Sequence, residues 1–120
     1  MLDRKSPQRI VQLPDGYWDY HEASSAALTD ALVQATPGGG NALYITDIVF
    51  STGAATAWNI FFEIGTLTVL GPWYLEAIAG RGAALHFTVP KKIGPNGPLT
   101  VTTSAAIAHS IDIVGFIAAG

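Results

Sequence analysis

The stretch that most constrains the fold is residues 42–51, with the sequence ALYITDIVFS. Most of its side chains are β-branched or aromatic, and such side chains favour a pleated, half-buried strand. Glycines at positions 38–40 and at position 53 place a turn on each side of it. Both alternating sets of side chains are mostly apolar: Leu43, Ile45, Asp47 and Val49 on one side, Tyr44, Thr46, Ile48 and Phe50 on the other. We therefore expect a central strand covered on one face by a second sheet and on the other by part of the chain or by a neighbouring molecule.

The rest of the chain repeats this pattern of short apolar strands separated by Gly- and Pro-containing turns. About eight strands at a spacing of roughly eight to twelve residues are typical of an all-β sandwich or barrel. No helical period interrupts residues 41–120, which argues against a βαβ architecture. Residues 22–34 allow two interpretations, a helix or a strand from about Thr29, and we favour the strand. Further strands are expected at 56–64, 67–70, 73–79, 83–89, 99–103 and 107–118.

Composition limits the classes of partner. A chain of 120 residues suits one domain, and only 12% of the residues are charged, about half the usual share. We therefore expect much of the surface to face other subunits. The net charge of −3 argues against nucleic acid as a partner, because phosphate binding needs clustered cations. Charged residues interrupt every apolar stretch before it is long enough to span a membrane, so no membrane partner is expected.

The charges gather at the N-terminus, where the first 22 residues hold seven of the fifteen. Pro7 and Pro14 divide this segment, and Tyr17 to His21 is rich in aromatic residues. We expect an extended arm over residues 1–21 and a sandwich domain over residues 22–120. An extended peptide that is basic and partly apolar can add as a strand to an exposed sheet edge.

The ionisable residues give weak signals for chemistry. His86 and His109 lie inside predicted strands, where we expect hydrogen-bonded sheet or interface residues. His21 has Asp19 and Glu22 beside it, but metal sites normally need three or four converging ligands, and only this local cluster exists. We therefore expect no metal and no cofactor.

Two carboxylates, Glu63 and Glu76, fall in apolar strands. A pair of this kind could serve a glycosidase, or could be outward-facing charges that discourage aggregation at sheet edges. We favour the second interpretation. The sequence has no G-x-S-x-G elbow, no cysteine nucleophile and no phosphate loop, so we expect a protein that is not an enzyme.

Trp58, Trp73 and Tyr74 allow two interpretations. They could form a sugar-stacking platform, or Trp58 could lie in the core while Trp73 and Tyr74 lie in a subunit interface, where Trp and Tyr are enriched. We favour the core and interface interpretation.

Several segments together resemble small jelly-roll virion proteins of tailed bacteriophages. They are the central strand at 43–51, the Phe-Glu-Ile-Gly-Thr run at 62–66, the Leu-His-Phe run at 85–87 and the Gly-Pro-Leu-Thr-Val run at 97–101. The most similar group is the capsid decoration, or cement, proteins. The resemblance implies an antiparallel jelly-roll β-sandwich that forms a homotrimer on the outer surface of the capsid, after assembly in the host cytoplasm. It also implies an N-terminal arm that contacts the major capsid protein or a neighbouring trimer.

The expected function is therefore a structural one: binding the outside of a phage capsid and stabilising it. The major capsid protein and further copies of this chain are the expected partners. The alternatives are a phage tail-tip or fibre knob protein and a carbohydrate-binding module that uses Trp73 and Tyr74. The residues expected at the capsid or subunit interface are Arg4, Lys5, Arg9, Ile10, Val11, Leu13, Trp18, Tyr20, Trp73 and Tyr74.

Overall fold

The computed structural model describes residues 16–94 and 96–120, which form eight strands and no helix. The all-β prediction is therefore confirmed. The strands are β1 (Trp18–Ser24), β2 (Ala31–Gln34), β3 (Asn41–Thr52), β4 (Trp58–Ile64), β5 (Leu67–Leu75), β6 (Gly82–Ile93), β7 (Leu99–Thr103) and β8 (His109–Ala119).

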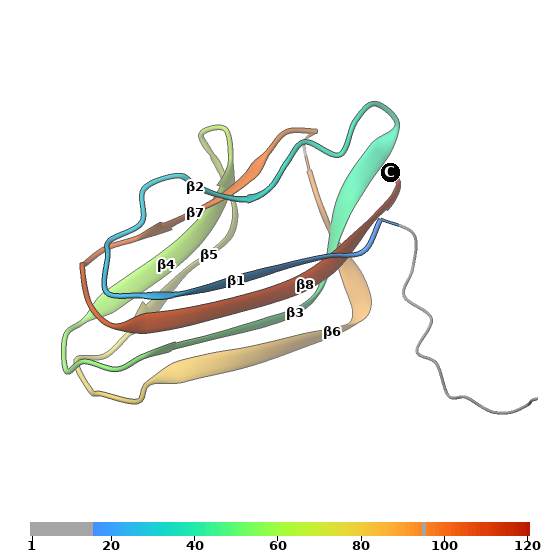
Figure 1. Ribbon diagram of the computed structural model, residues 1–120. Coiled ribbons are helices and arrows are strands. Elements are labelled where there is room, and N and C mark those ends of the chain that lie inside the picture. Colours follow the sequence, from blue (N-terminus) through green and yellow to red (C-terminus); the bar gives the residue numbers. More distant parts are fainter. Residues whose placement is uncertain (1–15, 95) are drawn as a thin grey trace, which may run out of the picture.

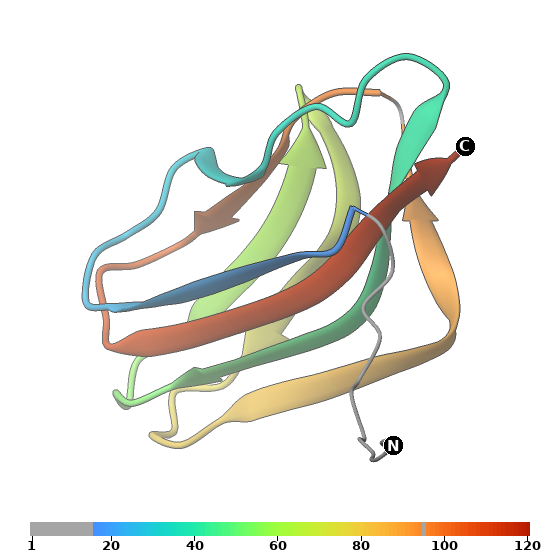
Figure 2. The same ribbon diagram turned by 45° about the vertical axis from the view of Figure 1, so that its right-hand side comes forward.

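The strands form two four-stranded antiparallel sheets that face each other (Figures 1 and 2). One sheet has the order β1-β8-β3-β6 and the other has the order β2-β7-β4-β5. The inward side chains of both sheets build a single core. Its largest fully buried members are Trp58, Phe50, Phe62, Leu43, Ile45, Ile48, Ile60, Ile93, Leu99, Ile111, Ile113 and Val101.

The predicted central strand lies within β3, which pairs with β8 on one side and with β6 on the other. A β-bulge between Ile45 and Asp47 shifts the alternation of its side chains. Leu43 and Ile45 face the core before the bulge, and Ile48 and Phe50 face it afterwards, whereas Val49 is 46% exposed. The bulge explains why both alternating sets of this sequence are mostly apolar.

The expected boundary between arm and domain after His21 is wrong, because β1 spans it. Residues Trp18–Ser24 pair with β8 in an unbroken antiparallel register, and Trp18 is buried in the core. Gly115 lies opposite Trp18, and a Cβ at that glycine would meet the indole ring at 2.6 Å. The part of the expected arm formed by residues 1–15 lies outside the described residues.

The ambiguous segment 22–34 contains no helix, which confirms the strand interpretation, but β2 starts at Ala31 instead of Thr29. The predicted pieces at 67–70 and 73–79 are one bulged strand, β5, which ends at Leu75. The predicted strand at 83–89 continues through Pro90 to Ile93, because β6 bulges away from β3 there and resumes pairing at Lys91.

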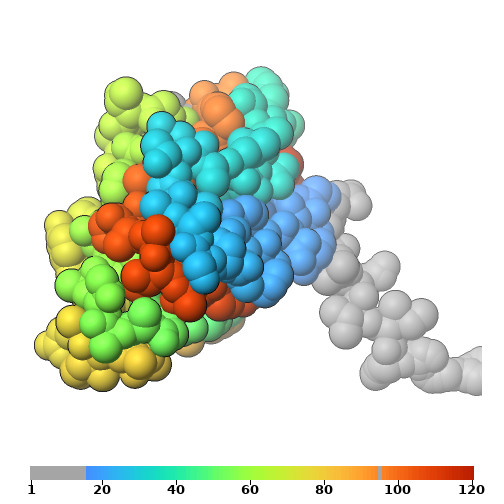
Figure 3. Space-filling model, turned by 60° about the vertical axis from the view of Figure 1, so that its left-hand side comes forward, coloured from blue at the N-terminus to red at the C-terminus, as the bar shows by residue number. Residues whose placement is uncertain are grey.

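The connections β1–β2, β3–β4, β5–β6 and β7–β8 all lie at one end of the sandwich, which we call the loop end (Figure 1). Figure 3 shows them in contact across this end. Backbone hydrogen bonds join them, including Gly53 N–H to the Ala108 carbonyl and Thr52 N–H to the Arg81 carbonyl, both 2.8 Å. These bonds fix the positions of neighbouring strand ends.

Candidate functional site

The buried imidazole of His109 lies at the loop end, where β8 begins. Its Nε2 lies 2.7 Å from Glu22 Oε1, and its Nδ1 lies 2.9 Å from the Ile107 carbonyl oxygen. The ring stacks on Trp58 with a centroid distance of 5.5 Å. Because a carbonyl oxygen only accepts, Nδ1–H donates to Ile107, and Nε2 and Glu22 share a proton.

The His109 cluster joins three strands, since Glu22 belongs to β1, His109 to β8 and Trp58 to β4. The His109 side chain has no exposed surface. A substrate in solvent therefore cannot reach the imidazole, and the arrangement serves to hold the two sheets together. The prediction of a hydrogen-bonded sheet residue is confirmed for His109.

Two further histidine–carboxylate pairs lie on the outer face of the β1-β8-β3-β6 sheet. His21 Nδ1 lies 2.6 Å from Asp112 Oδ1, and His86 Nδ1 lies 2.8 Å from Asp47 Oδ1. The hydrogen bond from His86, assisted by one from Thr46, holds the pKa of Asp47 below its ordinary value of 3.8. Each pair joins neighbouring strands, β1 to β8 and β3 to β6, and both pairs are exposed.

Asp19, His21 and Glu22, the possible metal ligands that are close together in the sequence, do not point to a common site. His21 bonds to Asp112 on the outer face, whereas Glu22 bonds to His109 towards the core. Alternation along β1 separates the two side chains, as in any strand. Within residues 16–94 and 96–120, no group of three or more His, Cys, Asp or Glu residues could hold a metal ion.

The two strand carboxylates lie far apart. Glu63 pairs with Thr68 near the end of β4, while Glu76 follows Leu75, which pairs with Trp58 at the other end of β4. Five residues of strand at about 3.3 Å each separate them by roughly 16 Å, beyond the roughly 9.5 Å limit of glycosidase pairs. Partial desolvation and a hydrogen bond with Asp30 raise the pKa of Glu63, and Glu76 pairs with Arg81 at 2.9 Å.

Trp73 and Tyr74 do not share a surface. A bulge in β5 contains Gly71 and Pro72, and the Trp73 ring turns inward against Phe50 and Phe62, with centroid distances of 5.4 and 6.2 Å. Tyr74 points outward and is 74% exposed. The sugar-stacking platform is therefore wrong for this pair, because of these two rings only that of Tyr74 is exposed to a partner.

The other predicted interface residues divide in a similar way. Trp18 is 6% exposed, so its ring belongs to the core instead of an interface. Tyr20 packs partly buried against the same core, and burial, followed by the charge of Glu22, raises the pKa of its hydroxyl. The remaining predicted residues, Arg4, Lys5, Arg9, Ile10, Val11 and Leu13, lie outside the described residues.

The structure adds one apolar surface that the sequence did not single out, the outer face of the β2-β7-β4-β5 sheet. Leu32 on β2 is 58% exposed, Tyr74 on β5 is exposed, and Phe61 on β4 is half-buried between them. Thr100 and Thr102 fill the strand between Leu32 and Phe61. The sequence signal for this surface is the strict alternation in the Trp58–Ile64 strand. It places Phe61 on the face opposite to the buried side chains of Trp58, Ile60, Phe62 and Ile64.

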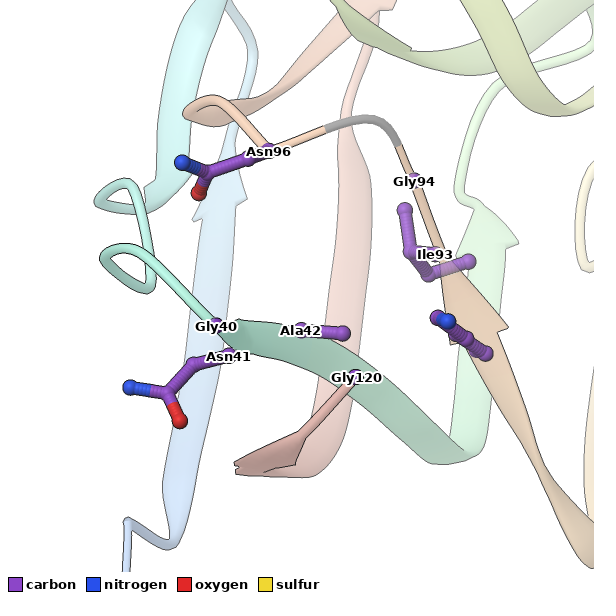
Figure 4. Close-up of a pocket in the computed structure, with 8 residues that line it drawn as sticks. Gly40, Asn41, Ala42, Ile93, Gly94, Asn96 and Gly120 are labelled. Atoms are coloured by element: carbon purple, nitrogen blue, oxygen red, sulfur yellow. The ribbon is translucent and has the colours of Figure 1, made fainter.

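Two shallow pockets lie among the described residues. The first, of about 290 Å³, lies between the start of β3, the end of β6 and Gly120, and is lined mainly by glycine, alanine and asparagine residues (Figure 4). The side chains of Asn41 and Asn96 both extend away from Ile93 in this view. The second, of about 260 Å³, lies beside His109 at the loop end.

No described helix is long and apolar enough to cross a membrane. The chain matches the model of no known protein family, and no curated protein matches it.

Proposed function

We propose that the sandwich is a jelly roll. Strand neighbours in the two sheets are β1 with β8, β2 with β7, β3 with β6, and β4 with β5. The first half of the chain thus pairs with the second half like one long hairpin whose tip is the β4–β5 turn. Rolling that hairpin up distributes its strands over two sheets in the order β1-β8-β3-β6 and β2-β7-β4-β5. This is the double Greek key of eight-stranded jelly rolls.

We infer from this topology that the chain is a structural virion protein that binds the outside of a phage capsid and stabilises it. The strand order is the observation that carries the proposal, because eight-stranded jelly rolls are a common architecture of viral capsid domains. A fold hosts many functions, so the surface must supply further support.

The surface supports a role in assembly. Leu32, Leu67 and Tyr74, all on strands of the β2-β7-β4-β5 sheet, are each more than half exposed. Exposed apolar residues that gather on one sheet are typical of subunit contacts, and aromatic residues are enriched in such contacts. A homotrimer is the proposed state, with Tyr74 in an interface of about 1,200–2,000 Å² in total.

Charge supports a contact made by the N-terminal segment. Residues 1–15 carry three of the six Lys and Arg residues but only two of the nine carboxylates. Arg4 and Lys5 are adjacent in the sequence, and such a cationic segment is suited to carboxylates on a capsid surface.

Co-sedimentation with empty heads, assembled from the major capsid protein encoded in the same genome, tests the proposal. We expect the protein to bind these heads and to raise the temperature at which they disassemble. Light scattering on the protein alone and on the protein released from heads should report a trimer.

Two matched charge reversals locate the contact. The double variant R4E/K5E should weaken head binding at least about tenfold, which corresponds to about 1.4 kcal/mol. The double variant K91E/K92E makes the same change in charge on the exposed part of β6, and should bind heads nearly as well as the wild type. A wild-type protein that does not bind heads contradicts the proposal, and binding to purified tails instead of heads favours a tail-tip or fibre protein.

A further inference from the structure

The two sides of the sandwich are covered to different extents. β1 and β2 are the edge strands on one side, where they contact each other. The large inward side chains that they supply, Trp18 and Val33, are each only 6% exposed. β5 and β6 are the edge strands on the other side, which we call the open side (Figure 1).

Some inward side chains of the open side remain in contact with solvent. On β6, Leu85 pairs with the buried Ile48, and alternation puts Val89 on the same side of the strand. Val89 is nevertheless 81% exposed. On β5, Leu67 pairs with the buried Ile64 and is still 54% exposed. The two sheets therefore leave apolar side chains uncovered between β5 and β6.

Most of the exposed apolar side chains gather at the open side. Among the described residues, seven large hydrophobic residues are exposed. Four of the seven lie on β5, on β6 or in the loop between them: Leu67, Tyr74, Ile78 and Val89. The same two strands hold further half-buried side chains that pack against the core: Trp73, Leu75, Leu85 and Phe87. A patch of this extent marks an interaction surface.

Charge and area favour a second copy of this chain as the partner. β5 and residues 82–89 of β6 contain no Asp, Glu, Lys or Arg, so two such surfaces can meet without opposing like charges. The nine residues of β5 at about 3.3 Å each, and two sheets about 10 Å apart with an edge strand of about 5 Å on each side, give a strip of about 600 Å². Two such strips in contact bury about 1,200 Å² in total, the lower limit of a stable, specific interface.

We propose that copies of this chain associate through the open side, with β5 of one copy against β6 of the next. Leu67 and Val89 lie towards the end of the sandwich opposite the loop end, whereas Tyr74 and Ala84 lie towards the loop end. A rotation axis parallel to the strands therefore brings Leu67 level with Val89 of the next copy. It also brings the exposed Tyr74 ring level with the small, exposed Ala84. Such a contact joins two different edges, and repeated around an axis it closes into a ring.

Side chains make this contact, because the strand edges do not suit a continuous backbone ladder. The bulge at Gly71 and Pro72 interrupts the edge of β5. Pro90 ends the apolar part of β6, and the exposed Lys91 and Lys92 follow where β6 pairs with β3 again. The two lysines thus lie outside the proposed contact. The inference rests on the homotrimer of the proposed function, whose contact surface it specifies, and does not require binding to a capsid.

Sedimentation equilibrium of the full chain tests the proposal with a matched pair of variants. V89K places a cation at the proposed contact, on a side chain that is already 81% exposed, so the fold should be retained. It should weaken association between copies at least about tenfold, because each lysine would lose solvent in the contact. V49K makes the same change on the outer face of β3, where Val49 is 46% exposed and pairs with Asp112, and should associate like the wild type. L67K is a second variant within the contact and should act like V89K.

Tryptophan fluorescence provides an independent measurement of the same contact. Trp18 and Trp58 are buried, whereas Trp73 is half-buried at the open side. Dilution of the wild type should therefore shift the emission to longer wavelengths as copies separate. V89K should show the shifted emission at every concentration, with a far-UV circular dichroism spectrum like that of the wild type.

The outcomes separate this proposal from the capsid proposal. A wild-type chain that stays monomeric at its highest soluble concentration overturns the inference, and so does a trimer that V89K and L67K leave intact. Neither result concerns head binding, which co-sedimentation measures separately. A wild-type trimer that V89K dissociates supports the inference, and if that trimer does not bind heads, only the capsid proposal is contradicted.

Discussion

Two adjacent residues of β3 test the bulge that positions the core. Ile48 is fully buried and pairs with Ile113, whereas its neighbour Val49 is 46% exposed. Without the bulge, Val49 would share the face of Leu43 and Ile45, and Ile48 would face outward. Truncation to alanine at each position therefore reports which side chain the core contains.

The expected loss in the free energy of unfolding follows from the number of buried carbon atoms that each substitution removes. Ile48→Ala removes three buried carbons, a loss of about 2.5 kcal/mol in transfer free energy at about 0.8 kcal/mol each. The residual cavity raises the total to about 3–4 kcal/mol. Val49→Ala removes two carbons that are half in water, which costs about 1 kcal/mol or less.

Denaturant unfolding followed by tryptophan fluorescence measures both losses. We expect the midpoint of I48A to fall at least threefold further than that of V49A, with unchanged m-values, so that the shifts report stability alone. Equal losses, or a larger loss in V49A, would show that the bulge does not reverse the alternation and that the register of β3 is wrong.

Two other predictions concern the outer face and the edge of the core. The hydrogen bond from His86 lowers the folded-state pKa of Asp47 below 3.8, so its stabilisation is present above about pH 4 and is lost as the pH falls through the lowered pKa. H86A should therefore flatten the acid limb of a stability-versus-pH curve, and an unchanged limb would exclude the pair as its source. A Cβ at Gly115 would lie 2.2 Å from the Tyr44 carbonyl oxygen, whereas one at Gly39 would meet nothing within 4 Å. In thermal melts G115A should lose several degrees relative to G39A, and equal melting temperatures would contradict the close approach of β1, β8 and β3.

The sequence predicts the strands best where local alternation and turn residues agree. The runs at 42–51 and 99–103 lie where they were expected, between glycine- and proline-rich turns. The prediction from sequence fails where a segment becomes a strand because it pairs with another strand far away in the sequence. The sequence pattern assigns residues 18–21 to an arm, because the strand that pairs with them, β8, lies more than ninety residues later.

The candidate site could be predicted from the sequence only in small part, for the same reason. His109 and Glu22 are 87 residues apart in the sequence, and only the β1–β8 register brings them to 2.7 Å. Trp73 and Tyr74 are neighbours in the sequence and suggest one aromatic surface, but adjacent residues of a strand point to opposite faces. The bulge at Gly71 and Pro72 then directs Trp73 into the core. Side-chain direction in a bulged strand depends on pairing, which composition and spacing do not contain.

The proposed capsid contact of the N-terminal segment depends on two adjacent cations, Arg4 and Lys5. Carboxylates on a capsid are the expected partners of these two cations. At an ionic strength of 0.15 M, charges further apart than about 8 Å are largely screened. Two cations on a short segment would therefore speed encounter more than they deepen affinity. The lasting part of the contact must then come from apolar area such as that around Tyr74, so salt should slow association while dissociation stays nearly constant.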